Sequence, residues 1–276
     1  MQRWILITGC SSGIGFDAAV RLHALNYRVI ASVKDISDAE PLKAQGLEHI
    51  IELDLRSSAS IRLAVDYCLT ASEGRLSALF NNGAYGQPGA VEDLTRDTLR
   101  QQFETNLFGV QELTNLLLPT LLKQSDARIV NCSSVLGLVA MPFRGAYNAS
   151  KFALEGLTDT LRLELRDTDV KVVLIEPGPI LTRFRQNALK ALEENIDIKA
   201  SRHNQAYEEN LVRLKKEGAA MPFTLGPEAV TAKLIRALES KSPRPRYYVT
   251  FPTYLMAACR RLLSTKLLDK FLIRAA

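Results

Sequence analysis

A tyrosine and a lysine four residues apart, Tyr147 and Lys151, are the residues of this 276-residue sequence best suited to chemistry. On a helix this spacing places both side chains on one side. A tyrosine has an ordinary pKa of about 10, and a neighbouring ammonium favours its ionised form, so the pair can transfer a proton near neutral pH. Ser134 lies thirteen residues before Tyr147 and adds a hydroxyl that can bond to a carbonyl oxygen. By itself, the tyrosine–lysine pair is more typical of an exposed face of an amphipathic helix.

The N-terminus contains a pattern typical of dinucleotide binding. The apolar residues Trp4–Ile7 predict a buried strand, and Thr8–Gly15 lead from it into a helix predicted over Phe16–Leu25. Glycines allow the backbone to approach a pyrophosphate, and the amides of a helix N-terminus attract it. The alternative is an ordinary strand-to-helix turn. The residues expected to contact the cofactor in this turn are Gly9, Ser11, Ser12, Gly13, Ile14 and Gly15.

Strands and helices alternate along the chain, which predicts an α/β fold with a doubly wound parallel sheet of about seven strands. The predicted strands are Trp4–Ile7, Arg28–Ser32, His49–Leu53, Ala78–Asn81, Arg128–Cys132, Lys171–Ile175 and Tyr247–Thr250. In such folds a ligand binds beyond the carboxyl ends of the strands, where the strand order reverses. The motifs above lie at such ends or on the intervening helices.

The chain is expected to form one catalytic domain, residues 1–253, followed by a tail, residues 254–276. Residues 179–226 break the alternation, mix charged residues with Leu and Phe, and are predicted to cover the substrate cleft. The tail is rich in Leu and basic residues, which predicts an amphipathic helix. Three roles remain open for this helix: peripheral contact with a membrane, closure over the substrate site, or packing in an oligomer.

Together these motifs resemble the short-chain dehydrogenase/reductase family. The family's glycine motif is matched by Thr8, Gly9, Gly13 and Gly15. Its other motifs are matched in order by Asn81–Ala84, Asn106, Ser134, Tyr147, Lys151, Pro177–Gly178 and Thr182. Within the family the chain is most similar to hydroxysteroid, retinol and aldehyde reductases, on Phe152–Leu157 and Glu176–Pro179.

The resemblance implies a Rossmann fold and a nicotinamide-dependent oxidoreductase with the catalytic residues Asn106, Ser134, Tyr147 and Lys151. Tyr147 would donate the proton and Ser134 would polarise the substrate oxygen. Lys151 would lower the pKa of Tyr147 and bind the nicotinamide ribose. Asn106 would hold a water that links Lys151 to solvent, although a residue at a helix kink bonded to the backbone is the alternative. Ser133 competes with Ser134, and the spacing favours Ser134.

The resemblance also implies cofactor contacts beyond the glycine-rich turn. They come from Asp54, Leu55, Asn82, Gly83, Tyr147, Lys151, Pro177, Gly178, Ile180 and Thr182. One departure concerns the turn after the fourth strand, where Gly83 and Ala84 are transposed relative to the family. If residue 84 needs a positive φ, the Cβ of Ala84 costs about 1 kcal/mol or more.

The preference between cofactors is expected to depend on the end of the second predicted strand. No acidic residue occupies the family's position for binding a ribose 2′-hydroxyl, and Lys34 follows directly. A cation there can pair with a 2′-phosphate, which favours NADP(H) over NAD(H). Asp35 leaves NAD(H) open, because its carboxylate can turn inward instead.

The substrate is expected to be a hydrophobic carbonyl compound or alcohol: an aldehyde, a retinal-like compound or a steroid-like ketone. Apolar residues lie between Ser134 and Tyr147, where family members line their pocket; loop packing is the alternative role for them. The predicted substrate-binding residues are Ser134, Leu136, Leu138, Met141, Phe143 and Tyr147.

Composition excludes several other classes. The net charge of +5 is spread along the chain without a nucleic-acid-binding module, so no nucleic acid is expected as a partner. The four cysteines are scattered and the three histidines do not cluster, which predicts reduced thiols, a cytoplasmic protein and no metal site.

Two further points of function remain open. The leucine stripe Leu154, Leu157, Leu161 and Leu165 predicts a homodimer or homotetramer, or else packing against the sheet. A non-catalytic NADP(H)-binding redox sensor, and an epimerase or dehydratase of the same family, are the alternative functions, because a fold does not determine a reaction.

Overall fold

A sheet of seven parallel strands forms the centre of the structure, a computed structural model that describes residues 3–216, 218–219 and 221–275. The strands are β1 (Trp4–Ile7), β2 (Arg28–Val33), β3 (His49–Glu52), β4 (Leu76–Asn81), β5 (Arg128–Cys132), β6 (Lys171–Pro177) and β7 (Arg246–Val249). Each lies within two residues of its predicted bounds. The strand order is β3-β2-β1-β4-β5-β6-β7, so the winding reverses between β1 and β4. The predicted doubly wound parallel fold is confirmed.

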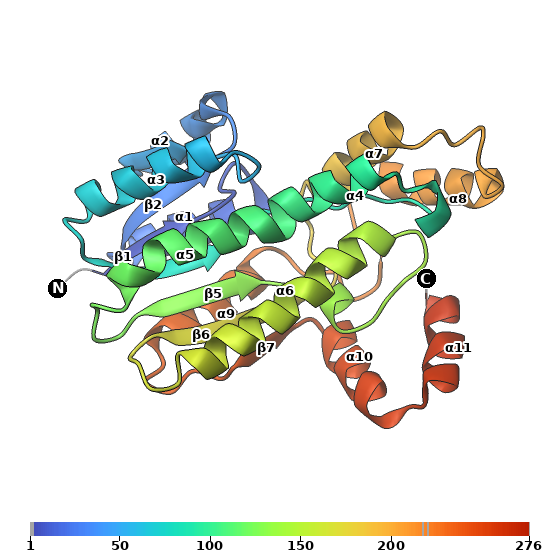
Figure 1. The fold of residues 1–276 in the computed structure, drawn as a ribbon. Helices are drawn as coiled ribbons and strands as arrows, with labels where there is room; N and C mark the ends of the chain where they lie inside the picture. Colours follow the sequence, from blue (N-terminus) through green and yellow to red (C-terminus); the bar gives the residue numbers. More distant parts are fainter. Residues whose placement is uncertain (1–2, 217, 220, 276) are drawn as a thin grey trace.

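Helices cover both faces of the sheet (Figure 1). One face carries α1 (Gly13–Ala24) and α9 (Glu228–Glu239), and the other carries α3 (Ser58–Ala71), α5 (Gly109–Leu121) and α6 (Gly145–Glu164). The remaining helices are α2 (Glu40–Lys43), α4 (Arg96–Phe103), α7 (Phe184–Asn195), α8 (Asn204–Lys215), α10 (Phe251–Leu262) and α11 (Thr265–Ala275). Short 3₁₀ turns lie at η1 (Ile36–Ala39), η2 (Val91–Asp93) and η4 (Val135–Gly137), and a π-helical turn, η3 (Glu104–Phe108), joins α4 to α5.

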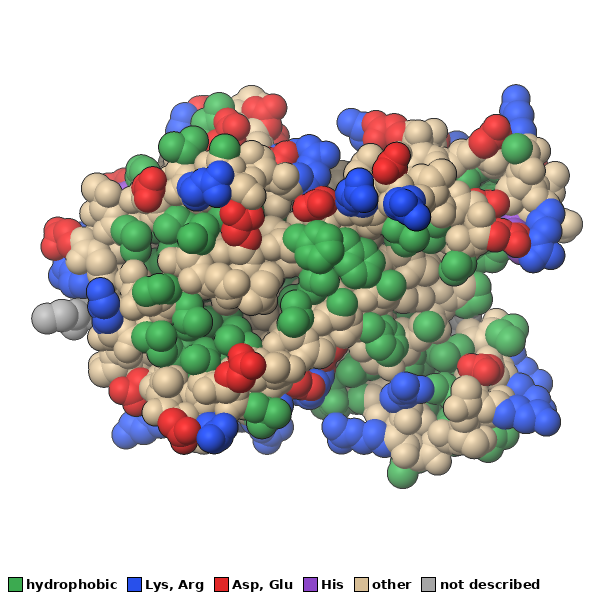
Figure 2. Space-filling model, in the orientation of Figure 1, with side chains coloured by type: hydrophobic (Ala, Val, Ile, Leu, Met, Phe, Trp, Pro, Cys, Tyr) green, Lys and Arg blue, Asp and Glu red, His purple; other side chains and the backbone are tan. Residues whose placement is uncertain are grey.

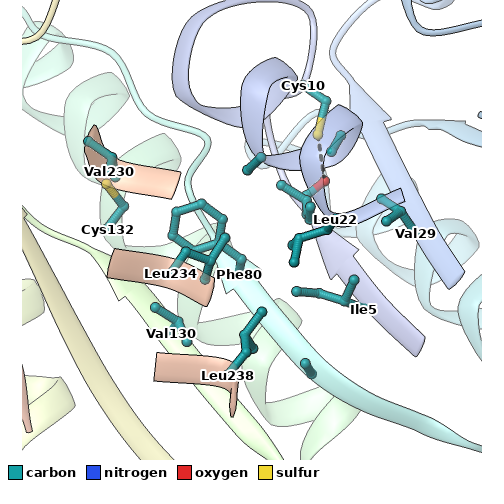
Figure 3. Packing of buried hydrophobic residues seen from close by; sticks show 14 of the residues in the cluster. Ile5, Cys10, Leu22, Val29, Phe80, Val130, Cys132, Val230, Leu234 and Leu238 are labelled. Carbon is teal, nitrogen blue, oxygen red and sulfur yellow. Dashed lines mark hydrogen bonds between the residues drawn. The ribbon is translucent and has the colours of Figure 1, made fainter. Parts of the chain in front are cut away.

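The core is divided by the sheet because strand side chains alternate between its faces. In β1, Ile5 packs toward α1 and α9, whereas Leu6 packs toward α3 and α5. Figure 3 shows the first of these layers, in which Phe80 and Val130 of the sheet meet Leu234 of α9. Burial on both faces explains why the strands are continuous apolar runs.

Residues 179–226 form a separate lobe beyond the sheet (Figure 1). The lobe contains α7 and α8, which pack on each other around Leu192 and Tyr207. Its two ends meet, since the amide of Leu181 donates to the carbonyl of Leu225 at 2.8 Å. The chain therefore leaves and re-enters the main body at one place, as an inserted segment must. Residues 217 and 220 of this range lie outside the described part, as do residues 1, 2 and 276 of the other predicted ranges.

The C-terminal tail differs from the prediction of a single helix. It forms two helices, α10 and α11, separated at Leu263 and Ser264, and α10 begins at Phe251 rather than at residue 254. The break follows from the extended backbone of Leu263 (φ −92°, ψ 144°). Ser264 then starts the new helix, as its carbonyl accepts from the amide of Leu268 at 2.9 Å.

Candidate active site

The glycine-rich turn between β1 and α1 is shaped to admit a large anionic group. Gly9 and Gly13 adopt positive φ values of 71° and 59°. A Cβ on Gly15 would lie 2.2 Å from the carbonyl oxygen of Gly9, so only glycine allows this close approach. The first-turn amides of a helix have no acceptor within the helix, and the Ser12 side chain does not cap them. The first turn also contains no acidic residue, so a pyrophosphate fits this end of α1.

A cavity of about 470 Å³ opens beside this turn. Its walls are Ser12, Gly13, Phe16, Asp17, Leu181, Thr182, Arg183, Gln186 and Pro227. Thr182 contacts the glycine-rich turn, because a Cβ on Gly13 would meet its Cγ2 at 2.9 Å. The structure thus brings three of the predicted cofactor residues, Ser12, Gly13 and Thr182, to one cavity.

The other predicted residues after β6 hold this strand end in place. The amide of Gly178 donates to Val249 of β7 at 3.1 Å, and a Cβ on Gly178 would lie 2.2 Å from the Thr250 hydroxyl. Ile180 forms an isolated bridge with Leu225. Pro177, Gly178 and Ile180 therefore connect β6 to the base of the inserted lobe.

The turn after β4 contacts the glycine-rich turn through hydrogen bonds. The amides of Asn82 and Gly83 both donate to the Thr8 hydroxyl, at 2.9 and 2.8 Å, and Asn82 Nδ2 donates to the Thr8 carbonyl at 2.9 Å. Ala84 is not among the residues with positive φ. The cost considered for the Gly83–Ala84 transposition therefore does not arise.

Two cations lie near the end of β2. Lys34 is exposed directly after the strand, and Asp35 is occupied as the cap of η1, where its carboxylate accepts from the amide of Ser37 at 2.9 Å. Arg56, which the sequence analysis did not single out, donates to the Asp54 carboxylate at 2.8 Å. The pKa of Asp54 is lowered by this bond, with a smaller electrostatic contribution from Lys34. Lys34, Asp54 and Arg56 thus share one edge of the site.

The three residues predicted to transfer or direct the proton, Ser134, Tyr147 and Lys151, meet at the carboxyl end of β5. Ser134 follows the strand and caps η4, where its Oγ accepts from the amide of Leu136 at 3.1 Å. Tyr147 and Lys151 lie on α6, and the Lys151 ammonium is 5.7 Å from the centre of the Tyr147 ring. Lys151 is almost fully buried and donates to the carbonyl of Cys132 at 2.8 Å.

Burial dominates the electrostatics of this group. It raises the pKa of Tyr147, and a hydrogen bond with the Ser134 side chain only partly opposes this. Burial also lowers the pKa of Lys151. Burial thus outweighs any lowering of the Tyr147 pKa by Lys151, because the low-dielectric surroundings disfavour both charged forms.

Ser133, the competing serine, lies on the other side of the same strand end. Its hydroxyl lies near Glu155 and lowers the pKa of that carboxyl, against the larger effect of burial, but it has no hydrogen-bond partner among the described residues. Ser134, by contrast, bonds to Tyr147. The geometry agrees with the spacing in favouring Ser134 as the residue beside the substrate oxygen.

Asn106 occupies the π-helical turn between α4 and α5. Its Nδ2 donates to the Tyr85 carbonyl at 2.9 Å and to the Ser150 hydroxyl at 3.1 Å, and its Oδ1 accepts from the Tyr85 amide at 3.1 Å. The side chain is thus bonded to the backbone at a helix irregularity, which is the alternative role considered for Asn106. It connects the turn after β4 to Ser150 of α6, the residue directly before Lys151.

The predicted substrate residues separate into three environments. Leu136 and Met141 pack with the tail residues Met256 and Leu268 in a small core that Tyr147 contacts. Phe143 instead packs on the lobe. Its ring lies 5.5 Å from those of His203 and Tyr207, so the structure moves Phe143 away from Leu136.

Leu138 lines a different cavity of about 400 Å³ between α6, β7 and α10. The other walls are Gly137, Phe152, Glu155, Asp159, Arg246, Tyr248, Ala257, Arg260 and Arg261. We therefore do not include Leu138 in the proposed substrate pocket, because its neighbours there are mostly charged.

Two contacts at Tyr147 were not predicted residue by residue. The Phe184 ring, at the start of α7, lies 5.3 Å from the Tyr147 ring. The tail helices contribute Met256, Leu268 and Leu272 to the small core beside Tyr147. The sequence marks these four side chains only by their apolar character, since none of them carries a reactive group.

The comparisons with known proteins agree with this geometry. Residues 3–193 match the model of the short chain dehydrogenase family. The chain is 40% identical over 272 residues to the uncharacterized oxidoreductase YbbO of Escherichia coli strain K12, covering 99% of this chain and 94% of YbbO. It is 32% identical over 260 residues to human 17-beta-hydroxysteroid dehydrogenase type 1, covering 89% of this chain and 77% of that protein.

A solved structure is similar over almost the whole chain. It is a short-chain dehydrogenase/reductase from Burkholderia phymatum in complex with NAD, with a TM-score of 0.78 and 28% identity over 95% of this chain and 92% of that one. The protein belongs to the short-chain dehydrogenase/reductase family and is an oxidoreductase of that family with a nicotinamide cofactor site. Among the described residues, none of the helices has the length and apolar composition needed to cross a membrane.

Proposed function

We propose that the protein transfers a hydride between NADP(H) and a hydrophobic aldehyde or ketone, or the corresponding alcohol. The observation that carries this proposal is the meeting of Ser134, Tyr147 and Lys151 after β5, at the sheet edge where the glycine-rich turn follows β1, with an apolar wall built by Leu136 and Met141. A proton donor, a hydroxyl that binds the substrate oxygen and a cofactor cradle are the parts that carbonyl reduction requires.

The residues of the chain have distinct roles in this reaction. The bound cofactor supplies the hydride, and the first turn of α1 with Thr182 would hold it. Tyr147 donates its proton to the substrate oxygen as that oxygen gains negative charge. Ser134 hydrogen-bonds the same oxygen. Because it lies close enough to Tyr147 to lower the pKa of that phenol, the two hydroxyls are already together before the step.

Lys151 is proposed to bind the nicotinamide ribose and to stabilise the tyrosinate left after proton transfer. Its ammonium is buried and already lies 5.7 Å from the Tyr147 ring. Because burial raises the pKa of Tyr147, the tyrosine stays protonated at neutral pH and is ready to act as an acid in the reductive direction. We propose that Asn106 holds the water through the main chain of the π-helical turn, since its side-chain amide is already hydrogen-bonded to Tyr85 and Ser150.

NADP(H) is proposed over NAD(H), because the site edge after β2 carries Lys34 and Arg56 and its two acids are engaged. Asp35 caps η1, and Asp54 pairs with Arg56. The test compares kcat/KM for NADPH and NADH in the wild type and in Lys34→Asp. We expect the ratio to move towards NADH, and an unchanged ratio would show that Lys34 does not bind the 2′-phosphate.

The substrate proposal is tested by NADPH oxidation with a panel of aldehydes and ketones. Medium and long aldehydes, retinal-like compounds and steroid-like ketones should give higher kcat/KM than short or polar ones. The same assay separates the alternatives: a redox sensor binds NADPH without turnover, and an epimerase or dehydratase forms product without net NADPH oxidation. Either outcome would contradict the proposed function.

Two surfaces are proposed to contact partners. Apolar side chains gather over the face of α5 and α6 (Figure 2), and we propose this face for a homodimer or homotetramer. Leu157 of α6 and Phe108 of η3, directly before α5, are 41% and 51% exposed. On the tail, Leu262 and Ile273 are 82% and 69% exposed among basic residues, which supports peripheral membrane contact by a protein we place in the cytoplasm. Co-sedimentation with anionic vesicles tests the membrane contact.

A further inference from the structure

Arg144 has an unusual environment for a charged side chain. It directly precedes α6, three residues before Tyr147, and it is half-buried. Its guanidinium has five N–H donors, yet the hydrogen bond it makes within the described residues goes to the thioether sulfur of Met141, at 2.6 Å. Burial and the positive charge of Arg213 lower the pKa of Arg144 to about 10. A strong acceptor is missing from its surroundings.

Arg213 lies on α8, which packs on the loop before α6, because its neighbour Leu214 shares a small core with Phe143, the residue before Arg144. Its Nη2 donates to Asn210 Oδ1 at 3.3 Å, a long hydrogen bond. Burial and the nearby Arg185 lower the pKa of Arg213. Arg185 itself donates to the main-chain carbonyls of Arg213 and Lys216, at 3.2 and 2.8 Å, so it holds the end of α8 and adds a third positive charge.

None of these three arginines forms an ion pair with a carboxylate in the part of the chain that the structure describes. Arg202, at the other end of the same lobe, shows the usual arrangement, since it is 76% exposed and pairs with Glu92. Holding two half-buried cations together without a counter-ion is unfavourable, because each is partly desolvated and they repel each other. The fold nevertheless keeps them in place.

A strained turn keeps Arg144 beside α8. Phe143 has a φ of 59°, which is rare for a bulky residue. Its carbonyl accepts from the amide of Gly89 at 2.9 Å, and its ring packs on Tyr207. Backbone strain of this kind is found mainly where a side chain must be placed for function.

The arginine pair adjoins the reacting centre. Arg144 and Tyr147 are separated by one helical turn, and Phe184, the neighbour of Arg185, contacts the Tyr147 ring. We propose that Arg144 and Arg213 form a binding site for a carboxylate on the substrate, at the end away from the carbonyl. The substrate is then an amphipathic compound with a hydrophobic body, a reducible carbonyl and a terminal carboxylate. A carboxylate would accept charge-assisted bonds from both guanidinium groups, and this inference rests on the proposed function.

The test compares an ω-oxo fatty acid of medium chain length with its methyl ester, in the wild type and in Arg144→Gln, Arg213→Gln and the double variant. The two substrates share the aldehyde and the hydrophobic body and differ only in the charge. We expect each single substitution to lower kcat/KM for the acid by about tenfold or more, the loss of a hydrogen bond to a charged group, while the ester changes little. The matched control is Arg202→Gln, which removes the same charge from the lobe outside the proposed site.

Each outcome decides the proposal. An equal loss with acid and ester would show that the arginines only support the lobe, and a raised KM for NADPH would assign them to the cofactor's phosphates; both results would overturn it. If neither substrate is reduced, the proposed function fails separately. In that case the melting temperature with NADPH and a medium-chain fatty acid decides, since the fatty acid should stabilise the wild type and not Arg213→Gln.

Discussion

The docking of α11 on the substrate side can be tested by one pair of neighbouring substitutions. Leu268 is 4% exposed and packs against the core that includes Leu136 and Met141, whereas the next residue back, Leu267, is 54% exposed. Leu268→Ala should weaken the docking of α11 on the body. Leu267→Ala has the same chemistry and should leave α11 docked.

The magnitude follows from the buried side chains of α11. Leu268 and Leu272 are its two buried leucines, and burying each is worth about 1.5–3 kcal/mol, so docking by apolar contact amounts to about 3–6 kcal/mol. Replacing a buried Leu by Ala removes about 2 kcal/mol or more. A change of about 2 kcal/mol raises the undocked population about 30-fold. The main sheet should keep its stability, because α11 is peripheral and can open locally.

Two measurements follow this change. Limited proteolysis within the tail reports the undocked population and should accelerate about 30-fold in Leu268→Ala when opening is fast relative to cleavage. KM should rise for long aldehydes more than for short ones, since the tail builds the wall that contacts a long chain. If Leu268→Ala and Leu267→Ala show the same proteolysis and the same KM values at every length, α11 has neither the docking nor the role argued for it.

Three further predictions concern the catalytic centre, the buried charges and the assembly. Tyr147→Phe should lower the rate by about 10²–10⁴-fold while leaving NADPH binding nearly intact, and residual activity above about a tenth would exclude Tyr147 as the proton donor. Burial raises the pKa of Glu176 to about 8, so between pH 4.5 and about 8 the folded protein keeps a proton that the unfolded chain releases. The free energy of unfolding should therefore fall as the pH rises through this range. Urea unfolding should show that loss in the wild type and less of it in Glu176→Gln; equal pH profiles would contradict the shift. Light scattering at micromolar concentration should give the mass of a dimer or tetramer, and Leu157→Glu on the exposed face of α6 should shift it towards the monomer.

The local pattern of the sequence was sufficient for the fold and for placing Tyr147 and Lys151 on one helix. Continuous apolar runs marked the strands, because both faces of a parallel sheet are buried. The spacing of Tyr147 and Lys151 on a helix, and the turn from Gly9 to Gly15, are set by residues close together in the chain. Such features depend on local geometry, so they can be recognised before any tertiary contact is known.

The tertiary structure decided which candidate roles the side chains can take. Leu138 and Phe143 belong to the same loop as Leu136, but they have different neighbours. Leu138 lies beside α10, and Phe143 packs against α8. The sequence left open whether the Asp35 carboxylate turns towards the cofactor, and the structure shows that it caps η1. The side chain of Asn106 was open in the same way until Tyr85, from a distant turn, accepted and donated its hydrogen bonds.

Charge and burial are the properties that the sequence could not determine. The pKa of Tyr147 depends on how much of the chain surrounds it, and that burial outweighs the neighbouring lysine. Arg144 and Arg213 are 69 positions apart in the sequence and meet only because the inserted lobe folds back over the loop before α6. Local spacing determined which groups can react, whereas desolvation and contacts between distant segments decided their charge, their partners and the shape of the pocket around them.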